Sequence, residues 1–214
     1  GLVGSEMCIR DRGNITAKFL ENCKVRCKGM LKADAILHSD VECQENVDIL
    51  GKKGLINGGS LSTYADVHAT TLGSTMGAST KIKIISDKEL IIRANEIKEE
   101  VENKEETLRK IDEVVNRVKG QLASNQEVLP EQMNYLKQAT VNKPLLVKQI
   151  RELREEREKL LVRIEKNKHS CIRVEGAVYS GIDITVKDVS KIQHEQVSHC
   201  RFVRDGADVR IVGL

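Results

Sequence analysis

The sequence has few aromatic side chains: five of its 214 residues are Tyr or Phe, and none is Trp. Proteins that bind single-stranded nucleic acid stack the bases on aromatic rings, so this composition argues against such a surface. Proline occurs only twice, which excludes a proline-rich linker. No run of apolar residues is longer than four, whereas a membrane-spanning helix needs about 20.

The net charge is also small. Lys and Arg number 35 and Asp and Glu number 32, which gives a formal charge of +3. A balance this even does not indicate a nucleic-acid or membrane-surface binder. We therefore expect no nucleic-acid partner and no membrane insertion.

The first twelve residues, GLVGSEMCIRDR, have no hydrophobic periodicity, and the string SEMCIRDR resembles translated sequencing-adapter read-through. We interpret residues 1–12 as a spurious leader without a fold. They lack the basic start and apolar stretch of a signal peptide. Because no natural N-terminus is recognisable, we expect the chain to be a fragment.

Charge density divides the rest of the chain into two kinds of sequence. In residues 86–168, 35 of 83 side chains are charged, against 32 of the other 131. This segment contains one glycine, Gly120, while the flanks hold most of the glycines and β-branched residues. The middle therefore indicates helix, and the flanks indicate short strands and turns.

The N-terminal flank repeats with a period of 16 residues, and apolar residues alternate within each repeat. The aligned positions are Ile15, Leu31 and Val47; Ala17, Ala33 and Ile49; Val25 and Val41; Cys27 and Cys43. A coil of parallel strands explains this pattern, because each turn buries its inward residues on the same residues of the next turn. The alternation continues at Ala65–Ala69, Ile82–Ile84, Ile172–Val186 and Val209–Ile211. We predict one β-solenoid in two parts, residues 13–85 and 169–214.

The charged segment 86–168 has the three-and-four spacing of an antiparallel coiled-coil hairpin. Its first seam is Ala94, Ile97, Val101, Lys104, Leu108, Ile111, Val115, Val118 and Leu122; its second is Leu146, Ile150, Leu153, Arg157, Leu160 and Ile164. The reversal falls at 120–129, and Pro130 suits the start of the second helix. Pro144 predicts a kink or break near residues 139–143. Lys104 and Arg157 are polar residues in the seams. We expect such residues to lower the stability of the hairpin and to fix its register or its choice of partner.

No candidate site outweighs a structural interpretation. The spacing of Cys23 and Cys27 is one residue too long for a zinc knuckle, Cys8 lies in the leader, and Cys43 stacks on Cys27 as a small core residue. His194 and His199 are five residues apart, so they do not share a helix face, and we favour a solvated turn or edge.

Three further patterns have similar explanations. The glycines of Gly51–Gly54 and Gly58–Gly59 lack a P-loop signature and suit turns between rungs, with anion binding as the alternative. Neighbours such as His38, Ser39 and Asp40 face opposite ways on a strand and cannot form a triad. We favour a solvated outer strand face over a nucleic-acid groove for the basic residues Lys24, Arg26, Lys28 and Lys32. We expect no catalytic, cofactor or metal site.

Two glycine-rich stretches carry a family resemblance. The first runs from Gly51-Lys52-Lys53-Gly54-Leu55-Ile56-Asn57-Gly58-Gly59 through Ala65, Ala69, Leu72-Gly73-Ser74 and Gly77-Ala78-Ser79-Thr80; the second is Val174-Glu175-Gly176-Ala177-Val178-Tyr179-Ser180-Gly181-Ile182-Asp183-Ile184. In this order around a coiled coil, the chain resembles the bacterial flagellar assembly protein A family from Gly13 to Leu214. Ser180 stands where the family usually has proline, and the family's N-terminal region is absent.

The resemblance implies a right-handed β-helix, no established enzymatic activity, and a cytoplasmic role in flagellar assembly or polar organisation. We expect a scaffold whose coiled coil binds a protein partner and whose solenoid ends allow homo-oligomers. A fainter likeness is to the β-helix domain of the Min-system cell-division inhibitor. A left-handed β-helix acyltransferase is disfavoured, because the period is 16 residues rather than about 18 and [LIV]-Gly hexads are lacking.

Overall fold

The computed structural model describes residues 7–214, which form fourteen strands and two helices. The strands before the helices are β1 (Met7–Asp11), β2 (Ile15–Glu21), β3 (Cys23–Cys27), β4 (Leu31–Cys43), β5 (Val47–Ile49), β6 (Leu55–Thr63), β7 (Val67–Ala69), β8 (Thr71–Leu72) and β9 (Thr80–Ile84). The rest are α1 (Lys88–Ala123), α2 (Pro130–Lys166), β10 (Ile172–Val178), β11 (Ile182–Val186), β12 (Val189–Gln193), β13 (Val197–Asp205) and β14 (Asp208–Gly213).

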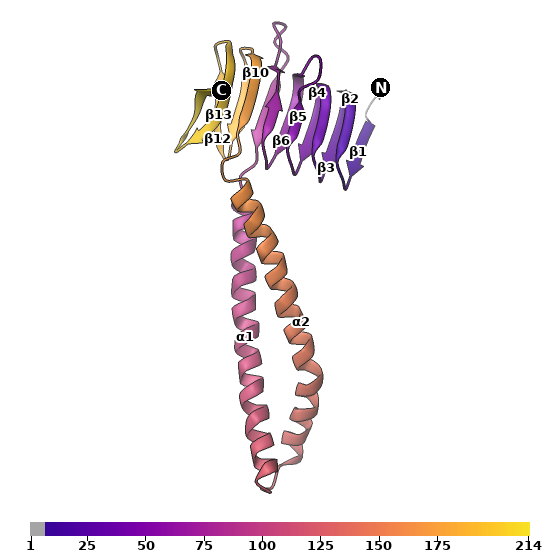
Figure 1. Ribbon diagram of the computed structural model, residues 1–214, viewed down its shortest axis with the longest axis vertical. Helices are drawn as coiled ribbons and strands as arrows, with labels where there is room; N and C mark the ends of the chain where they lie inside the picture. Colours follow the sequence, from indigo (N-terminus) through magenta and orange to yellow (C-terminus); the bar gives the residue numbers. More distant parts are fainter. Residues whose placement is uncertain (1–6) are drawn as a thin grey trace. The chain divides into compact units, whose positions relative to one another are not determined.

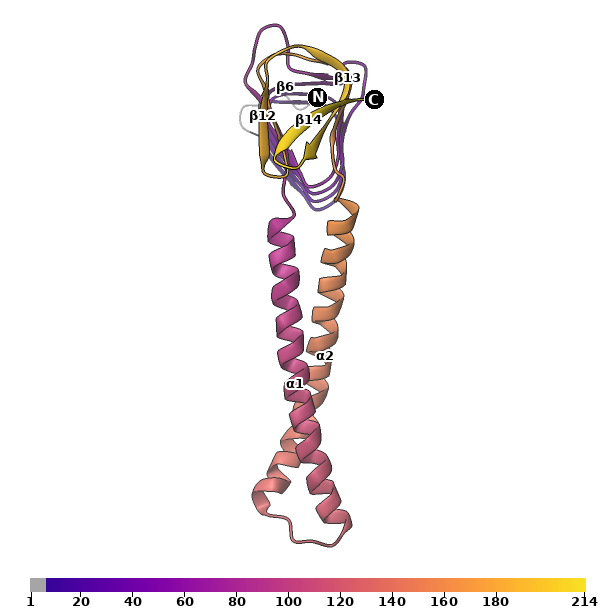
Figure 2. The same ribbon diagram turned by 90° about the vertical axis from the view of Figure 1, so that its left-hand side faces the viewer.

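The strands up to β11 coil into a three-sided solenoid, in which successive rungs lie one behind another (Figure 2). Each side has a buried column of paired residues. The columns are Ile15, Leu31, Val47, Val67 and Ile172; Leu20, Ile36, Ile56, Leu72 and Val178; and Val25, Val41, Leu61, Ile82 and Ile184. Burial of each such side chain contributes about 1.5–3 kcal/mol, so the three columns supply the core.

The 16-residue columns predicted from the sequence are confirmed. Ile15 pairs with Leu31 and Leu31 pairs with Val47, each in a parallel ladder. The next step, from Val47 to Val67, is 20 residues long, yet the register is kept. Extra residues between strands therefore change the corners of the coil and leave its walls in register.

The solenoid ends in antiparallel strands, which differs from the expectation that Val209 and Ile211 continue the parallel coil. β12 pairs antiparallel with β11, β13 with β10, and β14 with β13. The cause is local: Lys187 and Asp188 have φ of 48° and 72°, which suits the two-residue turn that reverses a strand into a hairpin. Gly206, with φ of 62°, lies at the second reversal.

The prediction that residues 1–12 have no fold is wrong for β1. Met7–Asp11 pair in parallel with β3, and Ile9 lies opposite Val25 and packs against the core. A strand at the end of a solenoid presents unpaired N–H and C=O groups, and a preceding segment with an inward apolar residue pairs with them. Residues 1–6 lie outside the described part of the chain, as does the side chain of Cys8.

The helical hairpin matches its predicted bounds closely. α1 begins one residue after Asp87 and ends at Ala123, and α2 begins at Pro130. The antiparallel order follows from contacts such as Arg93 with Glu156 and Lys143 with Asp112. α2 is unbroken through Pro144, so the predicted break is absent, and the helix bows over this part (Figure 1).

The described chain divides into two compact units. Of the described residues, 7–87 and 166–214 belong to the solenoid unit, and 88–165 belong to the hairpin unit. The sequence boundaries at residues 86 and 168 lie two and three residues from these. Neither described helix is long and apolar enough to cross a membrane.

Candidate functional site

The hairpin is inserted at one corner of the solenoid, and four other rungs cross the same corner with three residues each. Those corner segments are 12–14, 28–30, 44–46 and 64–66, and the corresponding segment of the last rung is 85–171. The backbone ladder is unaffected by this difference in length. The amide of Val47 donates to the carbonyl of Asp66 over 3.0 Å, and that of Val67 donates to Cys171 over 3.1 Å.

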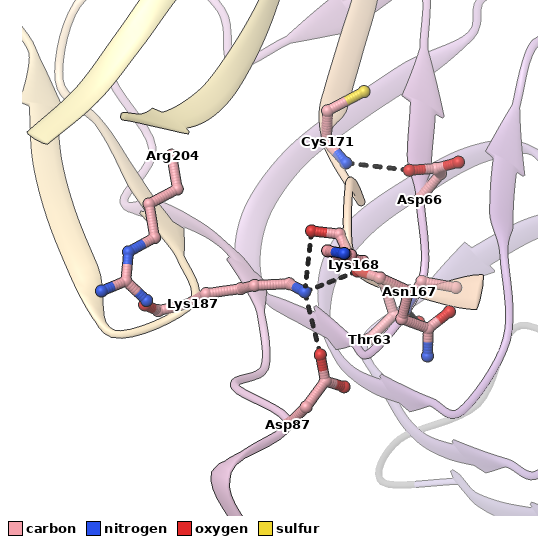
Figure 3. A network of polar contacts seen from close by, with 9 residues as sticks. Thr63, Asp66, Asp87, Asn167, Lys168, Cys171, Lys187 and Arg204 are labelled. Carbon is pink, nitrogen blue, oxygen red and sulfur yellow. Dashed lines mark hydrogen bonds and ion pairs between the residues drawn. The ribbon is translucent and has the colours of Figure 1, made fainter. Parts of the chain in front are cut away.

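At this corner, short polar side chains accept hydrogen bonds from backbone amides of the neighbouring rung. Asn14 Oδ1 accepts from the amide of Met30 over 2.8 Å, and Asn46 Oδ1 accepts from the amide of Asp66 over 3.2 Å. Asp66 Oδ1 then accepts from the amide of Cys171 over 2.8 Å, at the point where the chain returns from the hairpin (Figure 3). These side chains satisfy amides that a corner otherwise leaves unpaired.

Lys187 connects the two ends of the insertion (Figure 3). Its Nζ donates to Asp87 Oδ2 over 2.9 Å, to the carbonyl of Asn167 over 2.5 Å and to the carbonyl of Lys168 over 3.3 Å. The side chains of Lys187 and Asp87 are 13% and 7% exposed. An ammonium group has three N–H donors, so this buried cation is fully used in holding the exit and return segments together.

Arg204, in β13, supports the turn that contains Lys187. Its Nη1 donates to the carbonyl of Lys187 over 2.9 Å, and its Nε donates to the carbonyl of Gly206 over 3.0 Å. We refer to Asp87, Asn167, Lys168, Lys187 and Arg204 as the corner clasp.

A cavity of about 490 Å³ lies beside the corner clasp within the solenoid unit. It is lined by Lys168, His169, Ser170, Cys171, Lys187, Arg201, Val203, Arg204, Gly206, Arg210 and Val212. Five of these residues are Lys or Arg and none is Asp or Glu. We refer to it as the basic pocket.

The thiol in the basic pocket is not activated. Burial raises the pKa of Cys171, and Asp66 raises it further, while Arg201 and Arg173 act in the opposite direction. Because the thiolate is the nucleophilic form, a raised pKa makes Cys171 a poor nucleophile at neutral pH. The arrangement therefore suits binding rather than covalent chemistry.

Within the hairpin unit, polar seam residues have partners on the opposite helix. Lys104 Nζ donates to Gln149 Oε1 over 3.2 Å and lies 3.6 Å from Glu100, its neighbour one turn away. Arg157 Nε donates to the carbonyl of Ala94 over 3.2 Å. Both contacts define one register between α1 and α2, which is the role expected of polar residues in a seam.

The hairpin also exposes large apolar side chains. Its packed cluster is centred on Ile97, Val101 and Ile150, all on the solenoid side of the seam. Toward the connecting loop, several apolar side chains remain exposed: Leu122 (43%), Leu129 (59%), Met133 (38%), Val141 (65%), Leu145 (56%) and Val147 (47%). Ile91, Ile92, Leu161 and Val162 are exposed near the other end of the hairpin, so exposed apolar side chains occur along its whole length and are more numerous in the loop-side half.

The predicted stacking of cysteines is confirmed. Cys27 pairs with Cys43 in adjacent rungs, and both are buried. Burial raises the pKa of the Cys43 thiol strongly, with Cys27 adding to it. Cys23 lies in the same strand as Cys27, and its amide donates to Ser39 Oγ. Among the side chains that the structure describes, no three of His, Cys, Asp or Glu are grouped to hold a metal ion.

The two histidine patterns lie in different settings. His194 lies in the connection between β12 and β13, whereas His199 lies within β13 rather than in the expected turn or edge, and both are exposed. In β4, Ser39 is buried, and its hydroxyl donates to the carbonyl of Leu37 over 2.7 Å. Asp40 instead accepts from Ser60 Oγ on the next rung. Ser39 and Asp40 therefore contact different groups.

The glycines allow the backbones of neighbouring rungs to approach each other closely. Gly54 follows a turn, while Gly58 and Gly59 lie inside β6 with φ of 76° and 86°. A Cβ atom at Gly59 would be 2.2 Å from the carbonyl oxygen of Ser39 in the rung before. Only glycine fits that backbone.

The basic residues predicted on the outer face are exposed there. Lys24 lies opposite Asp40, and Arg26 lies opposite Glu42, with 3.6 Å between Arg26 Nε and a Glu42 carboxylate oxygen. Lys28 and Lys32 are also exposed. The acidic residues of the neighbouring rung thus face the basic residues of β3.

Sequence reasoning missed the corner clasp and the rung-to-rung hydrogen bonds of Asn14, Asn46 and Asp66. These three residues could have been found from the sequence, because each stands directly before an inward column residue. The corner clasp could not have been found in this way, because Lys187 and Asp87 are 100 residues apart, and only closure of the last rung brings them together.

These features define a class of protein, a β-solenoid that carries a helical hairpin in place of one corner. Residues 1–209 match the family described as the Flagellar Assembly Protein A beta solenoid domain, so the chain belongs to the FapA family. The resemblance drawn from the glycine-rich stretches is thereby confirmed. No curated protein and no solved structure matches the chain. Membership supports a structural protein of the flagellar-assembly type.

Proposed function

We propose that the chain is a non-enzymatic, cytoplasmic scaffold in flagellar assembly or polar organisation, and that its hairpin binds a protein partner. The observation that supports this proposal most strongly is the exposed apolar surface on the loop-side half of the hairpin. Val141 and Leu145 are 65% and 56% exposed and lie four residues apart, so they occupy one face of α2.

That face is separate from the seam. Leu146, next to Leu145 in sequence, packs against the apolar cluster between the helices, and consecutive residues point about 100° apart. The seam is also closed by ion pairs between α1 and α2, such as Lys143 with Asp112. Val141 and Leu145 therefore have no role in closing the hairpin, which leaves them available to a partner helix or groove.

The experiment replaces both residues in the full chain, Val141→Gln with Leu145→Gln. The matched control is Val162→Gln, at 59% exposure on the same helix but near its other end. Each protein would be expressed in a flagellated bacterium whose own member of the family has been deleted, with flagella counted by electron microscopy and bound proteins captured by cross-linking.

We expect the double variant to lose both the captured partner and the restoration of flagella, while Val162→Gln retains both. Circular dichroism must show the same helix content in all three proteins. Equal restoration by the double variant and the wild type would contradict the proposed binding face.

We also propose homo-oligomers through the ends of the solenoid. Within residues 7–214, β1 pairs only with β3 and β2 only with β4. Each of these strands therefore presents one edge of N–H and C=O groups, which is a template for pairing with another chain.

A further inference from the structure

We propose that the basic pocket binds a small organic phosphate that carries at least two negative charges. The pocket is built from the last strands of the solenoid unit, so this inference does not depend on the hairpin or on its partner. Its cavity of about 490 Å³ falls within the range of small-molecule sites, about 300–1,000 Å³.

The first argument is the balance of charge. Five Lys or Arg side chains and His169 line the cavity, and no carboxylate does. Two of the five cations are paired from outside it, Lys187 with Asp87 and Arg210 with Asp205 at 3.0 Å. Among the described residues, Arg201 and Arg204 have no carboxylate partner. The pocket therefore has an excess of positive charge that an anion would neutralise.

The second argument is the placement of Arg201. It lies directly opposite Arg173 in the antiparallel pair of β10 and β13, so two guanidinium groups share one face of the sheet. Like charges directly opposite each other destabilise a sheet. A phosphate beside Arg201 would offset this repulsion, and guanidinium groups bind phosphate oxygens through paired N–H donors.

The third argument is preorganisation. The two hydrogen bonds of Arg204 to carbonyls use two of its five N–H donors and fix the plane of the guanidinium, so three donors remain. Lys187 is different, because its three donors are all taken by the corner clasp. We therefore assign direct contact with the phosphate to Arg201 and Arg204, and only a general electrostatic contribution to Lys187.

The fourth argument concerns the rest of the ligand. Val203 and Val212 line the cavity and are half-buried, which gives a small organic group an apolar surface. The pocket contains no Phe, Tyr or Trp, the large aromatic side chains on which bases of a nucleic-acid strand usually stack. A small phosphorylated molecule fits this lining better than an RNA or DNA strand does.

The test is isothermal titration calorimetry on the full chain, at low ionic strength and at about 150 mM salt. The probes are ADP, inorganic pyrophosphate, adenosine and a 20-nucleotide single-stranded RNA. The variants are Arg201→Gln and Arg201→Lys, and the matched control is Arg26→Gln, which removes an exposed arginine from β3. Calorimetric melting of each variant checks that it is folded.

We expect ADP and pyrophosphate to bind the wild type with one site and adenosine not to bind. Arg201→Gln should weaken ADP binding about tenfold or more, because a charge-assisted pair is lost, whereas Arg26→Gln should leave it unchanged. Arg201→Lys should retain part of the affinity. The proposal is overturned if neither phosphate binds, if Arg26→Gln weakens binding as much as Arg201→Gln, or if RNA binds far more tightly than either phosphate.

Discussion

The ion pair between Asp87 and Lys187 gives the sharpest test of the corner clasp. Asp87→Asn keeps the size of the side chain and its position just before α1, and an amide oxygen can still accept a hydrogen bond. It removes the negative charge opposite a lysine side chain that is 13% exposed. The variant therefore isolates the charge interaction from the packing.

The expected loss can be worked from the burial of the pair. Removing one partner of a buried ion pair costs about 3–5 kcal/mol, because the other charge is left uncompensated. Lys187 keeps the carbonyls of Asn167 and Lys168 as acceptors, which places the cost at the low end. We expect about 3 kcal/mol, which lowers the melting temperature of the solenoid unit by roughly 10 °C.

Differential scanning calorimetry of the full chain measures this change, with Glu42→Gln as the matched control. Glu42 makes an exposed ion pair with Arg26, and such pairs contribute about 0–1 kcal/mol. The double variant Asp87→Asn with Lys187→Met should lose less than the sum of the two single losses, since neither charge is then left alone. Equal shifts for Asp87→Asn and Glu42→Gln would refute the reasoning.

The remaining predictions concern the hairpin and the solenoid ends. Replacing residues 88–165 with a short Gly/Ser linker, which leaves Asp87 and the segment from Lys166 intact, should give a chain that melts cooperatively with a β-rich circular dichroism spectrum. Lys104→Leu should raise the melting temperature of the isolated hairpin, because added burial in the seam outweighs an exposed hydrogen bond and a pair one turn apart. Light scattering of the full chain should show a mass that grows with concentration, because β1 presents an open edge.

Each of these predictions has a result that would contradict it. An unfolded linker variant would mean that the hairpin is part of the solenoid core. A lower melting temperature for Lys104→Leu would mean that the contact with Gln149 contributes more than the added apolar area. A strictly monomeric mass at high micromolar concentration would mean that the edge of β1 is covered.

The walls of the solenoid could be predicted from the sequence, because their signal is local. Val25 and Cys27 alternate with charged residues in one strand, and the same alternation recurs 16 residues later. The sequence signal for the hairpin is equally local, because Asp87 and Pro130 lie next to long segments with helical periodicity. Both predictions depend on which side of an element is apolar, and a single strand or helix contains that information.

The polar contacts at the corner could not be predicted in the same way. Whether Lys187 meets Asp87 depends on two ladders closing across an insertion, and whether β12 reverses depends on positive φ at Lys187 and Asp188. Neither residue type demands that conformation. The antiparallel end of the solenoid and the basic pocket beside it therefore could not be predicted from the sequence, because both depend on how the last rung closes.

The hairpin occupies a corner at which the solenoid does not fix the number of residues. Val67 and Asp66 both hydrogen-bond Cys171, which follows the long segment 85–171. The same two kinds of hydrogen bond form at corners that are only three residues long. Helical arms of other lengths, or a different domain with adjacent ends, are therefore interchangeable at this corner without a change of register.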